Sequence, residues 1–208
     1  MTENKLGRVG VIARFKPLHN GAYAMLEAVC ENANEVIIGI GSANKYSLRN
    51  PFTAKESEDM VRLTLEQKFS NYSIIHIPDF AQIPEYSDGK KWKEYVIEKF
   101  GKLDYFISSN PYVTDLLKDT YNVIQPYTII NSDKKIMMRG TLVRLEMARG
   151  NNWENLVPKE VAKYLKKNNL VERFRKEFGL QTLAELVNDT GINTTEDFGR
   201  EKIHPMEN

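Results

Sequence analysis

Apolar and polar positions divide the chain into short buried strands and longer amphipathic helices in regular alternation. Runs rich in β-branched residues, such as RVGVIARF at 8–15 and EVIIGIGSA at 35–43, predict buried strands. Apolar residues recur at helical spacing after the first run, at Leu26, Val29 and Cys30. The predicted strands are 8–15, 35–43, 72–77, 104–108 and 121–124, and the predicted helices are 20–32, 54–69, 90–100, 112–119, 141–149, 161–167, 171–178 and 181–188.

The alternation of strands and helices predicts an α/β fold, a Rossmann-like doubly wound parallel sheet with C-terminal helices. We expect right-handed crossovers and a ligand site beyond the carboxyl ends of the strands. Thr53, with Glu56 three residues later, predicts a capping box at the start of the second helix. One domain is expected over residues 1–179, followed by a short helix and a polar tail over 180–208 in which His204 is solvated.

Charge and composition narrow the class of protein. The 29 basic and 28 acidic residues give a formal net charge of +1, which argues against a broad nucleic-acid surface, so any phosphate binding must be local. No apolar run approaches the ~18 residues that cross a bilayer, and the N-terminal residues lack the apolar core of a signal peptide. Cys30 is the single cysteine and is expected to be buried, with no metal-type Cys/His spacing around it. These features favour a cytoplasmic protein without a membrane partner.

The loop at 14–22, RFKPLHNGA, is the first candidate for anion binding. A helix N-terminus offers free N–H groups and a partial positive charge, which suit an anion. His19 can donate a hydrogen bond to a phosphate oxygen, Arg14 can add fixed charge, and Gly21 allows close approach of the backbone to the anion. The alternative is a capped helix start with a surface histidine.

The segment RGTLVR at 139–144 is the second candidate. Gly140 and Thr141 begin a predicted helix, and Arg144 lies three residues beyond Thr141 on the same side of the first turn. Its side chain can therefore reach a phosphate held at that helix start. The alternative is an N-cap beside a solvated arginine.

Two further segments follow predicted strands and suit contacts to a base or ribose. They are 41–53, which begins with Gly41, Ser42 and Ala43, and 108–111, with the sequence SSNP. Each of these segments alone is equally well explained as an ordinary turn. Their order along the chain, together with the two basic loops, is what makes them informative.

The motifs RFKPLHNG, GSANKYSLRNPFTAKE, SSNPYV, RGTLVRLEMARGNNWENLVP and VAKYL together resemble the archaeal-type nicotinamide-mononucleotide adenylyltransferases of the nucleotidylyltransferase superfamily. The resemblance covers roughly residues 8–178. It implies that residues 1–179 form a nucleotidylyltransferase domain that transfers an AMP unit from ATP to nicotinamide mononucleotide, giving NAD and pyrophosphate. It also implies substrate-bound Mg²⁺ without a protein-built metal site, and a homo-oligomer (dimer, trimer or hexamer).

The resemblance assigns roles by position. It implies that the catalytic residues are Arg14, Lys16, His19 and Arg144. The ATP-binding residues implied are Phe15, Gly21, Ala22, Asn110, Arg139, Gly140, Thr141 and Arg144. The mononucleotide-binding residues implied are Gly41, Ser42, Ala43, Phe52, Thr53 and Trp92. Trp92 resembles the family's nicotinamide-stacking tryptophan but can equally be a core residue, and Trp153 is interpreted as packing.

The chain departs from the family pattern at several positions. Ala22 stands where the family has the second histidine of H-x-G-H, and losing such a phosphate donor costs about 10²–10³ in rate. The other departures are Ala13 for glycine, Lys16 for glutamine, Ser57 for arginine, Gly89 for asparagine and Arg139 for serine. Three explanations of Ala22 stay open: an engineered change, a natural enzyme in which Lys16 or Arg139 supplies the missing charge, and a homologue that binds nucleotide but catalyses poorly. A different phosphate acceptor is a further alternative, because the surroundings of Trp92 are altered.

Overall fold

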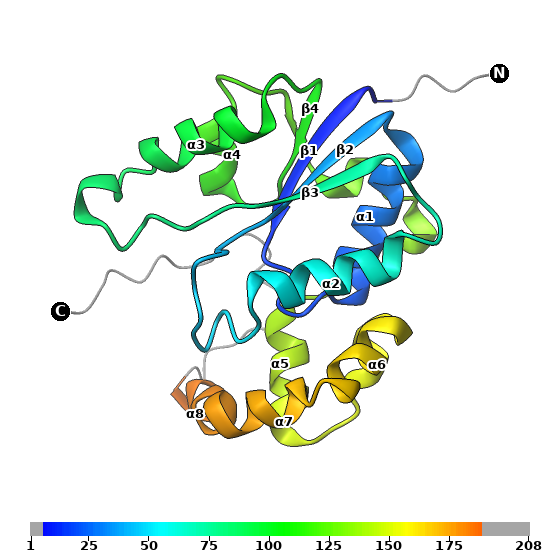
Figure 1. Ribbon diagram of the computed structural model, residues 1–208, viewed down its shortest axis with the longest axis vertical. Helices are drawn as coiled ribbons and strands as arrows, with labels where there is room; N and C mark the ends of the chain where they lie inside the picture. Colours follow the sequence, from blue (N-terminus) through cyan, green and yellow to red (C-terminus); the bar gives the residue numbers. More distant parts are fainter. Residues whose placement is uncertain (1–5, 189–208) are drawn as a thin grey trace.

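The computed structural model describes residues 6–188, with side chains described as far as Glu185, and its centre is a five-stranded parallel sheet (Figure 1). The strands run in the order β3-β2-β1-β4-β5, and Val9 of β1 pairs with Val36 of β2 on one side and with Tyr105 of β4 on the other. The strands are β1 (Arg8–Ala13), β2 (Glu35–Ile40), β3 (Tyr72–His76), β4 (Tyr105–Ile107) and β5 (Val123–Ile124).

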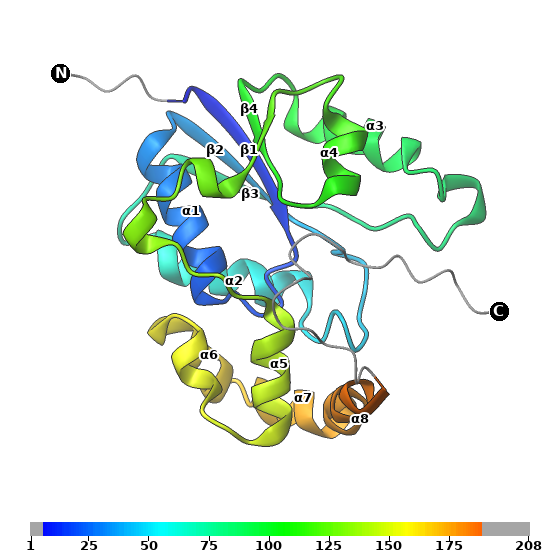
Figure 2. The ribbon, with the colours of Figure 1, turned by 180° about the vertical axis from the view of Figure 1, so that it is seen from behind.

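Helices cover both faces of this sheet. Figures 1 and 2 show α1 and α2 on one face and α3 and α4 on the other, so the sheet is doubly wound as predicted. The α-helices are α1 (Asn20–Asn32), α2 (Ala54–Leu65), α3 (Lys90–Phe100), α4 (Pro111–Leu117), α5 (Gly140–Arg149), α6 (Lys159–Lys167), α7 (Leu170–Phe174) and α8 (Leu180–Asn188). Short 3₁₀ turns lie at Pro84–Tyr86, Pro126–Thr128, Ser132–Lys134 and Trp153–Leu156.

Two apolar clusters explain why the strands read as continuous apolar runs. The larger cluster joins β1 and β2 to α1, α2 and the C-terminal helices, and it contains Cys30 and Trp153, both buried as predicted. The smaller cluster lies on the other face, where Ile37, Phe100 and Phe106 meet α3 and α4. A strand buried on both faces has no polar side to alternate with, so its pattern is apolar throughout.

The first two strands end earlier than the sequence predicts, for a local reason. Phe15 and Ser42 follow them with φ angles of 52° and 48°, in the left-handed region that non-glycine residues rarely adopt. This backbone turns the chain out of the sheet at the carboxyl ends of β1 and β2. Such residues cost about 1–3 kcal/mol each and cluster at functional sites.

The C-terminal helices gather at one end of the molecule, beyond α2 (Figure 1). The predicted helix 171–178 is divided: α7 ends at Phe174, and a π-helical turn, Arg175–Gly179, joins it to α8. The predicted domain boundary after 179 stays a prediction, and His204 lies outside the described residues. Between residues 6 and 188, no helix is both long and apolar enough to cross a membrane.

Candidate active site

Three of the segments singled out in the sequence meet at the carboxyl edge of the sheet. They follow β1 (Arg14–His19), β2 (Gly41–Ala43) and β4 (Ser108–Asn110). The sheet order places β2 and β3 on one side of β1, and β4 and β5 on the other. The strand order therefore reverses between β1 and β4, which is where ligands bind in doubly wound sheets.

His19 forms the start of α1 and is a neutral hydrogen-bond donor. Its Nδ1 accepts the backbone N–H of Ala22 at 3.1 Å, so the ring proton is on Nε2. Burial and the nearby charge of Arg144 lower the pKa of His19 to about 4. At neutral pH the imidazole therefore caps α1 with one nitrogen and presents an N–H with the other, as the predicted phosphate contact requires.

Arg144, on the first turns of α5, is buried at 8% exposure against the β1–α1 loop. Its Nη1 donates to the Lys16 carbonyl at 3.0 Å, and its Nη2 donates to Thr141 Oγ1 at 3.1 Å. A Cβ added at Gly140 would lie 3.3 Å from Arg144 Nη1 and 3.8 Å from His19 Cδ2. The two helix starts predicted to share one polyphosphate thus lie next to each other.

Gly21 has a packing role that the sequence did not indicate. A Cβ added there would lie 2.6 Å from the Ile136 carbonyl oxygen and 3.5 Å from Met138 Cβ. The segment that leads into α5 therefore lies against the side of Gly21 that a Cβ would occupy, and the approach of an anion to its backbone stays a prediction. Gly21 allows close approach of the chain to itself, and this contact brings the two helix starts together.

Lys16 contacts a different part of the site from the one expected. Its side chain is buried, and its Nζ donates to the carbonyls of Ser42 at 2.9 Å and Lys45 at 3.4 Å. Burial, together with the charge of Arg14, lowers the pKa of Lys16 to about 8, against an opposing effect of Glu56. The ammonium group thus tethers the loop after β2, so these contacts do not support a role as replacement for the histidine missing at position 22.

The two aromatic side chains assigned to ligand binding belong to the core. The ring of Phe52 has no exposed surface and lies 6.4 Å from the ring of Phe174, and that of Phe15 is 4% exposed. The core encloses these rings, so any contact of these two residues with nucleotide would come from the backbone, and it stays a prediction. They anchor their loops, and only the loop backbones remain for a ligand.

Thr53 and Asn110 cap helices with the acceptors that were expected to contact nucleotide. Thr53 Oγ1 accepts the N–H of Glu56 at 3.1 Å, and the Glu56 carboxylate accepts the Thr53 N–H at 2.8 Å, which confirms the predicted capping box. Asn110 Oδ1 accepts the N–H of Tyr112 at 2.9 Å at the start of α4. Contacts to ligand from their other atoms stay predictions.

Arg14 and Arg139 follow β1 and precede α5, and their contact with a polyphosphate stays a prediction. Arg14 is half-buried directly after β1, and Arg139 is exposed in the N-cap position of α5. Across residues 6–188, no cluster of three or more His, Cys, Asp or Glu side chains could hold a metal ion.

Comparison with known proteins agrees with this geometry. The model of the cytidylyltransferase-like family matches residues 11–196. The chain is 36% identical to a nicotinamide-nucleotide adenylyltransferase of Pyrococcus furiosus, over 79% of this chain and 85% of the relative. It is 31% identical to one of Methanosarcina mazei, over 81% and 92%. The chain belongs to the cytidylyltransferase-like family. It is a nucleotidyltransferase homologous to the archaeal enzymes, as the motifs indicate.

A solved structure shares the fold of this family member. It is a bifunctional NMN adenylyltransferase/ADP ribose pyrophosphatase from Francisella tularensis, complexed with AMP and a manganese ion. The TM-score is 0.63 at 18% identity, over 88% of this chain. This chain spans about half of that longer protein, 53% of its length.

Trp92 and Gly89 show how this family member differs near the predicted base pocket. Trp92 is half-buried on α3 and packs against the cluster around Phe100 and Phe106, so the core interpretation holds for part of its surface. Gly89 has a φ of 79°, and a Cβ there would lie 2.3 Å from the Tyr112 hydroxyl. The asparagine of the family pattern therefore does not fit here without a shift of Tyr112. Stacking of nicotinamide on Trp92 stays a prediction.

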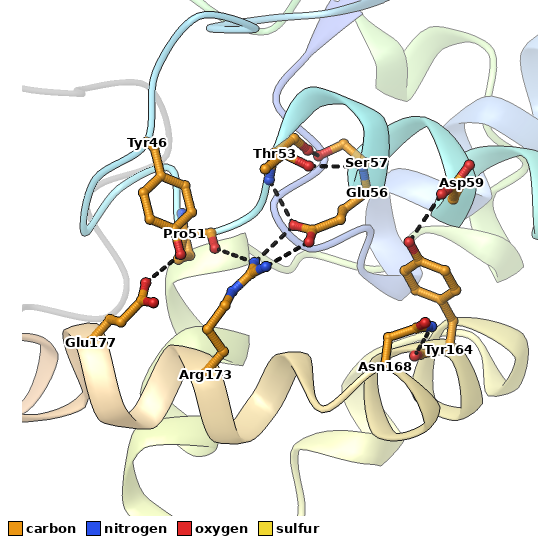
Figure 3. Close-up of polar contacts among 10 residues, drawn as sticks. All are labelled: Tyr46, Pro51, Thr53, Glu56, Ser57, Asp59, Tyr164, Asn168, Arg173 and Glu177. Atoms are coloured by element: carbon orange, nitrogen blue, oxygen red, sulfur yellow. Dashed lines mark hydrogen bonds and ion pairs between the residues drawn. The ribbon is translucent and has the colours of Figure 1, made fainter.

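Ser57, where the family has an arginine, points to a contact that sequence reasoning missed. The Ser57 hydroxyl is buried and donates to the Thr53 carbonyl at 3.0 Å. A cation reaches the same loop from α7 instead, because Arg173 forms an ion pair with Glu56 (Figure 3). The serine at position 57, in place of the family's arginine, was the one sequence feature that pointed to a different arrangement of charge at this loop.

Proposed function

We propose that this chain transfers the adenylyl group of ATP to nicotinamide mononucleotide, producing NAD and pyrophosphate. The observation that carries the proposal is the meeting of the His19 and Gly140 helix starts around the Arg144 guanidinium. Two helix N-termini, a neutral imidazole donor and a buried cation form a site suited to a polyphosphate. The names of the archaeal relatives support the choice of acceptor.

The proposed reaction is an in-line displacement at the α-phosphorus of ATP. A 5′-phosphate oxygen of the mononucleotide forms the new P–O bond, and the bond to the β-phosphate oxygen breaks, so that pyrophosphate leaves with its electron pair. The chain forms no covalent intermediate; it positions both phosphates and stabilises the charge that develops. His19 donates through Nε2–H, while Arg14, Arg139 and Arg144 supply positive charge at the polyphosphate end.

The divalent metal enters this proposal as part of the substrate, as MgATP. At the polyphosphate end the described residues offer cations and helix N-termini, which bind phosphate oxygens and not metal ions. This fits a metal ion that arrives bound to the triphosphate. The manganese ion named with AMP in the Francisella tularensis structure supports a divalent metal for the fold.

The mononucleotide is assigned to the loop after β2. Gly41 donates its N–H to the Ala13 carbonyl at 2.9 Å, and Ala43 donates to the Ile77 carbonyl at 3.0 Å, so the start of the loop continues the sheet. Lys16 Nζ donates to the carbonyls of Ser42 and Lys45 in the same loop. Homo-oligomerisation, the boundary after residue 179 and a cytoplasmic location remain predictions beside this assignment.

A second candidate function is favoured by Ala22. Without a side-chain donor at that position, the chain can bind nucleotide and turn it over poorly, or not at all. A different phosphate acceptor is favoured by Gly89, which stands where the family pattern has asparagine and where a larger residue would require Tyr112 to shift.

One assay separates these functions. The protein is incubated with ATP, Mg²⁺ and a panel of nicotinamide, nicotinate, adenine and uridine mononucleotides, and pyrophosphate and dinucleotide are quantified. NAD formed in equal amount to pyrophosphate, with nicotinamide mononucleotide alone, is the expected result. Equal turnover with a different mononucleotide contradicts the proposed acceptor, and ATP binding by calorimetry without pyrophosphate release contradicts the proposed activity.

A further inference from the structure

The second half of the loop between β2 and α2 is held by the C-terminal helices (Figure 3). Arg173 on α7 donates from Nη1 to Glu56 Oε1 at 2.6 Å and from Nη2 to Glu56 Oε2 at 2.8 Å. The same Nη2 donates to the Pro51 carbonyl at 3.1 Å. One guanidinium therefore grips both the carboxylate that caps α2 and the backbone immediately before the cap.

Tyr46 adds a second attachment from the same helices. The Arg173 guanidinium lies 5.6 Å from the centre of its ring, and the ring of Phe178 meets it edge-on at 5.5 Å. Its hydroxyl donates to the Glu177 carboxylate. Arg173 therefore contributes to both attachments, through its hydrogen bonds to the loop and its cation–π contact with Tyr46.

The first half of the loop has separate supports. Its backbone continues the sheet through Gly41 and Ala43, and Asn44 exchanges two hydrogen bonds with the backbone of Asp79, at 2.9 and 2.7 Å. Residues 41–45 are thus held by hydrogen bonds to β1, to Lys16 and to the segment after β3. Residues 46–53 depend on α7 and the π-helical turn.

We propose that Arg173 is a positioning residue for the mononucleotide, acting through Glu56 and Pro51 to hold residues 46–53 in their binding conformation. This inference rests on the proposed function of the loop. The hydrogen bonds of Arg173 go to Glu56 and Pro51, whereas those of Arg144 go to Lys16 and Thr141, so we expect the effect of Arg173 to fall on one substrate. The bidentate geometry matters as well as the charge, because lysine cannot reach both carboxylate oxygens and a carbonyl at once.

The decisive variant is Arg173→Met, which keeps an unbranched apolar stem and removes the guanidinium with its charge and donors. We expect the KM for the mononucleotide to rise at least tenfold, because its binding must then order the loop. The KM for ATP and kcat are expected to stay within threefold. Arg173→Lys is expected to give an intermediate KM, since it retains the charge alone.

Arg62→Met is the matched control. Arg62 also forms a 2.8 Å ion pair with a glutamate of α2, Glu58, but it lies on the exposed side of that helix. Both KM values are expected to stay unchanged in this variant. An equal rise in the KM for ATP and for mononucleotide in Arg173→Met, or the same rise in Arg62→Met, overturns the inference.

Amide hydrogen exchange provides a readout that needs no turnover. In Arg173→Met without nucleotide, exchange is expected to accelerate at residues 46–53 and to stay unchanged at 41–45. If the wild-type chain releases no pyrophosphate, the proposed function fails while this measurement still reports on Arg173. Unchanged exchange at 46–53 in both Arg173→Met and Arg173→Lys, with melting temperatures near that of the wild type, overturns the positioning role.

Discussion

At the polyphosphate end of the site, Arg144 and the Lys16 carbonyl meet in the buried interior, next to the His19 cap of α1. The loop 46–53 instead depends on side chains of a helix 117 residues further along the chain, at partly exposed positions. The first arrangement is a buried hydrogen bond. The loop 46–53 is buried at Asn50, Pro51 and Phe52, but the Arg173–Glu56 pair that holds it is partly exposed, so solvent can compete for that contact. The polyphosphate end is therefore expected to be preorganised, and the mononucleotide loop adjustable.

The strongest test of a preorganised polyphosphate end is Arg144→Ala. We expect kcat/KM for ATP to fall by about 10³, because an arginine at a transferring phosphate contributes about 10³–10⁵ in rate. The Lys16 carbonyl also loses its donor, so the free energy of unfolding is expected to fall by about 1–3 kcal/mol in denaturant titrations. Arg149→Ala is the control, since Arg149 lies on the same helix in an exposed ion pair with Glu146. Similar losses in both variants contradict a specific role.

Ala22→His tests whether this end still has a place for the second histidine of the family pattern. The expected gain in kcat is about 10², the amount that one phosphate donor contributes. The measurement is initial pyrophosphate release at saturating ATP and mononucleotide, with the melting temperature as a check on folding. No gain indicates that the polyphosphate end has been rebuilt around other donors.

Lys16→Met and Arg139→Ser separate the two ends. Lys16 holds the loop after β2, so its loss is expected to raise the KM for the mononucleotide about tenfold, whereas Arg139→Ser is expected to raise the KM for ATP. Because the pKa of Lys16 is about 8, with Arg14 and Glu56 beside it, the wild-type KM for mononucleotide should rise above pH 8 as the ammonium loses its charge. If the KM of Lys16→Met for the mononucleotide rises with pH in the same way, the pH dependence belongs to another group.

The smallest expected effect is on stability at mild acidity. The pKa of His19 is lowered to about 4, so at pH 5 the unfolded chain binds a proton that the folded chain excludes. The folded state therefore has its full stability above the ordinary pKa of histidine, where His19 is neutral in both states. This contribution to the free energy of unfolding is lost as the pH falls towards 4. Urea titrations are expected to show about 1–2 kcal/mol less stability at pH 5 than at pH 7. His19→Asn, which also caps a helix, should flatten this dependence; an equally steep one places the effect elsewhere.

The contrast between the two ends also explains what could be predicted from the sequence. The sheet, the helices and the capping box at Thr53 arise from local periodicity and spacing, and the structure confirms them. Sequence periodicity favours such features because their causes lie within a few residues. The meeting of His19 with the start of α5 joins distant segments, and it was predicted from the resemblance of the motifs to the nucleotidylyltransferase superfamily.

The misses have physical causes that act at long range. The Ile136 carbonyl lies against Gly21, and Lys16 bonds to Ser42, contacts that depend on tertiary packing. Phe15 turns the chain with a φ of 52°, and the rings of Phe15 and Phe52 lie in the core, which residue type alone does not reveal. The Arg173–Glu56 pair had no local signal except the serine at position 57.

The π-helical turn at Arg175–Gly179 sets the direction in which the side chains after α7 point, so a change in its length alters their contacts. Such a turn accommodates one residue more than an α-helical turn, and each residue rotates a helix by about 100°. Deleting a single residue within it would leave Arg173 facing Glu56 but turn Phe178 away from Tyr46. A one-residue deletion is thus expected to detach the loop at Tyr46 while sparing the ion pair between Arg173 and Glu56.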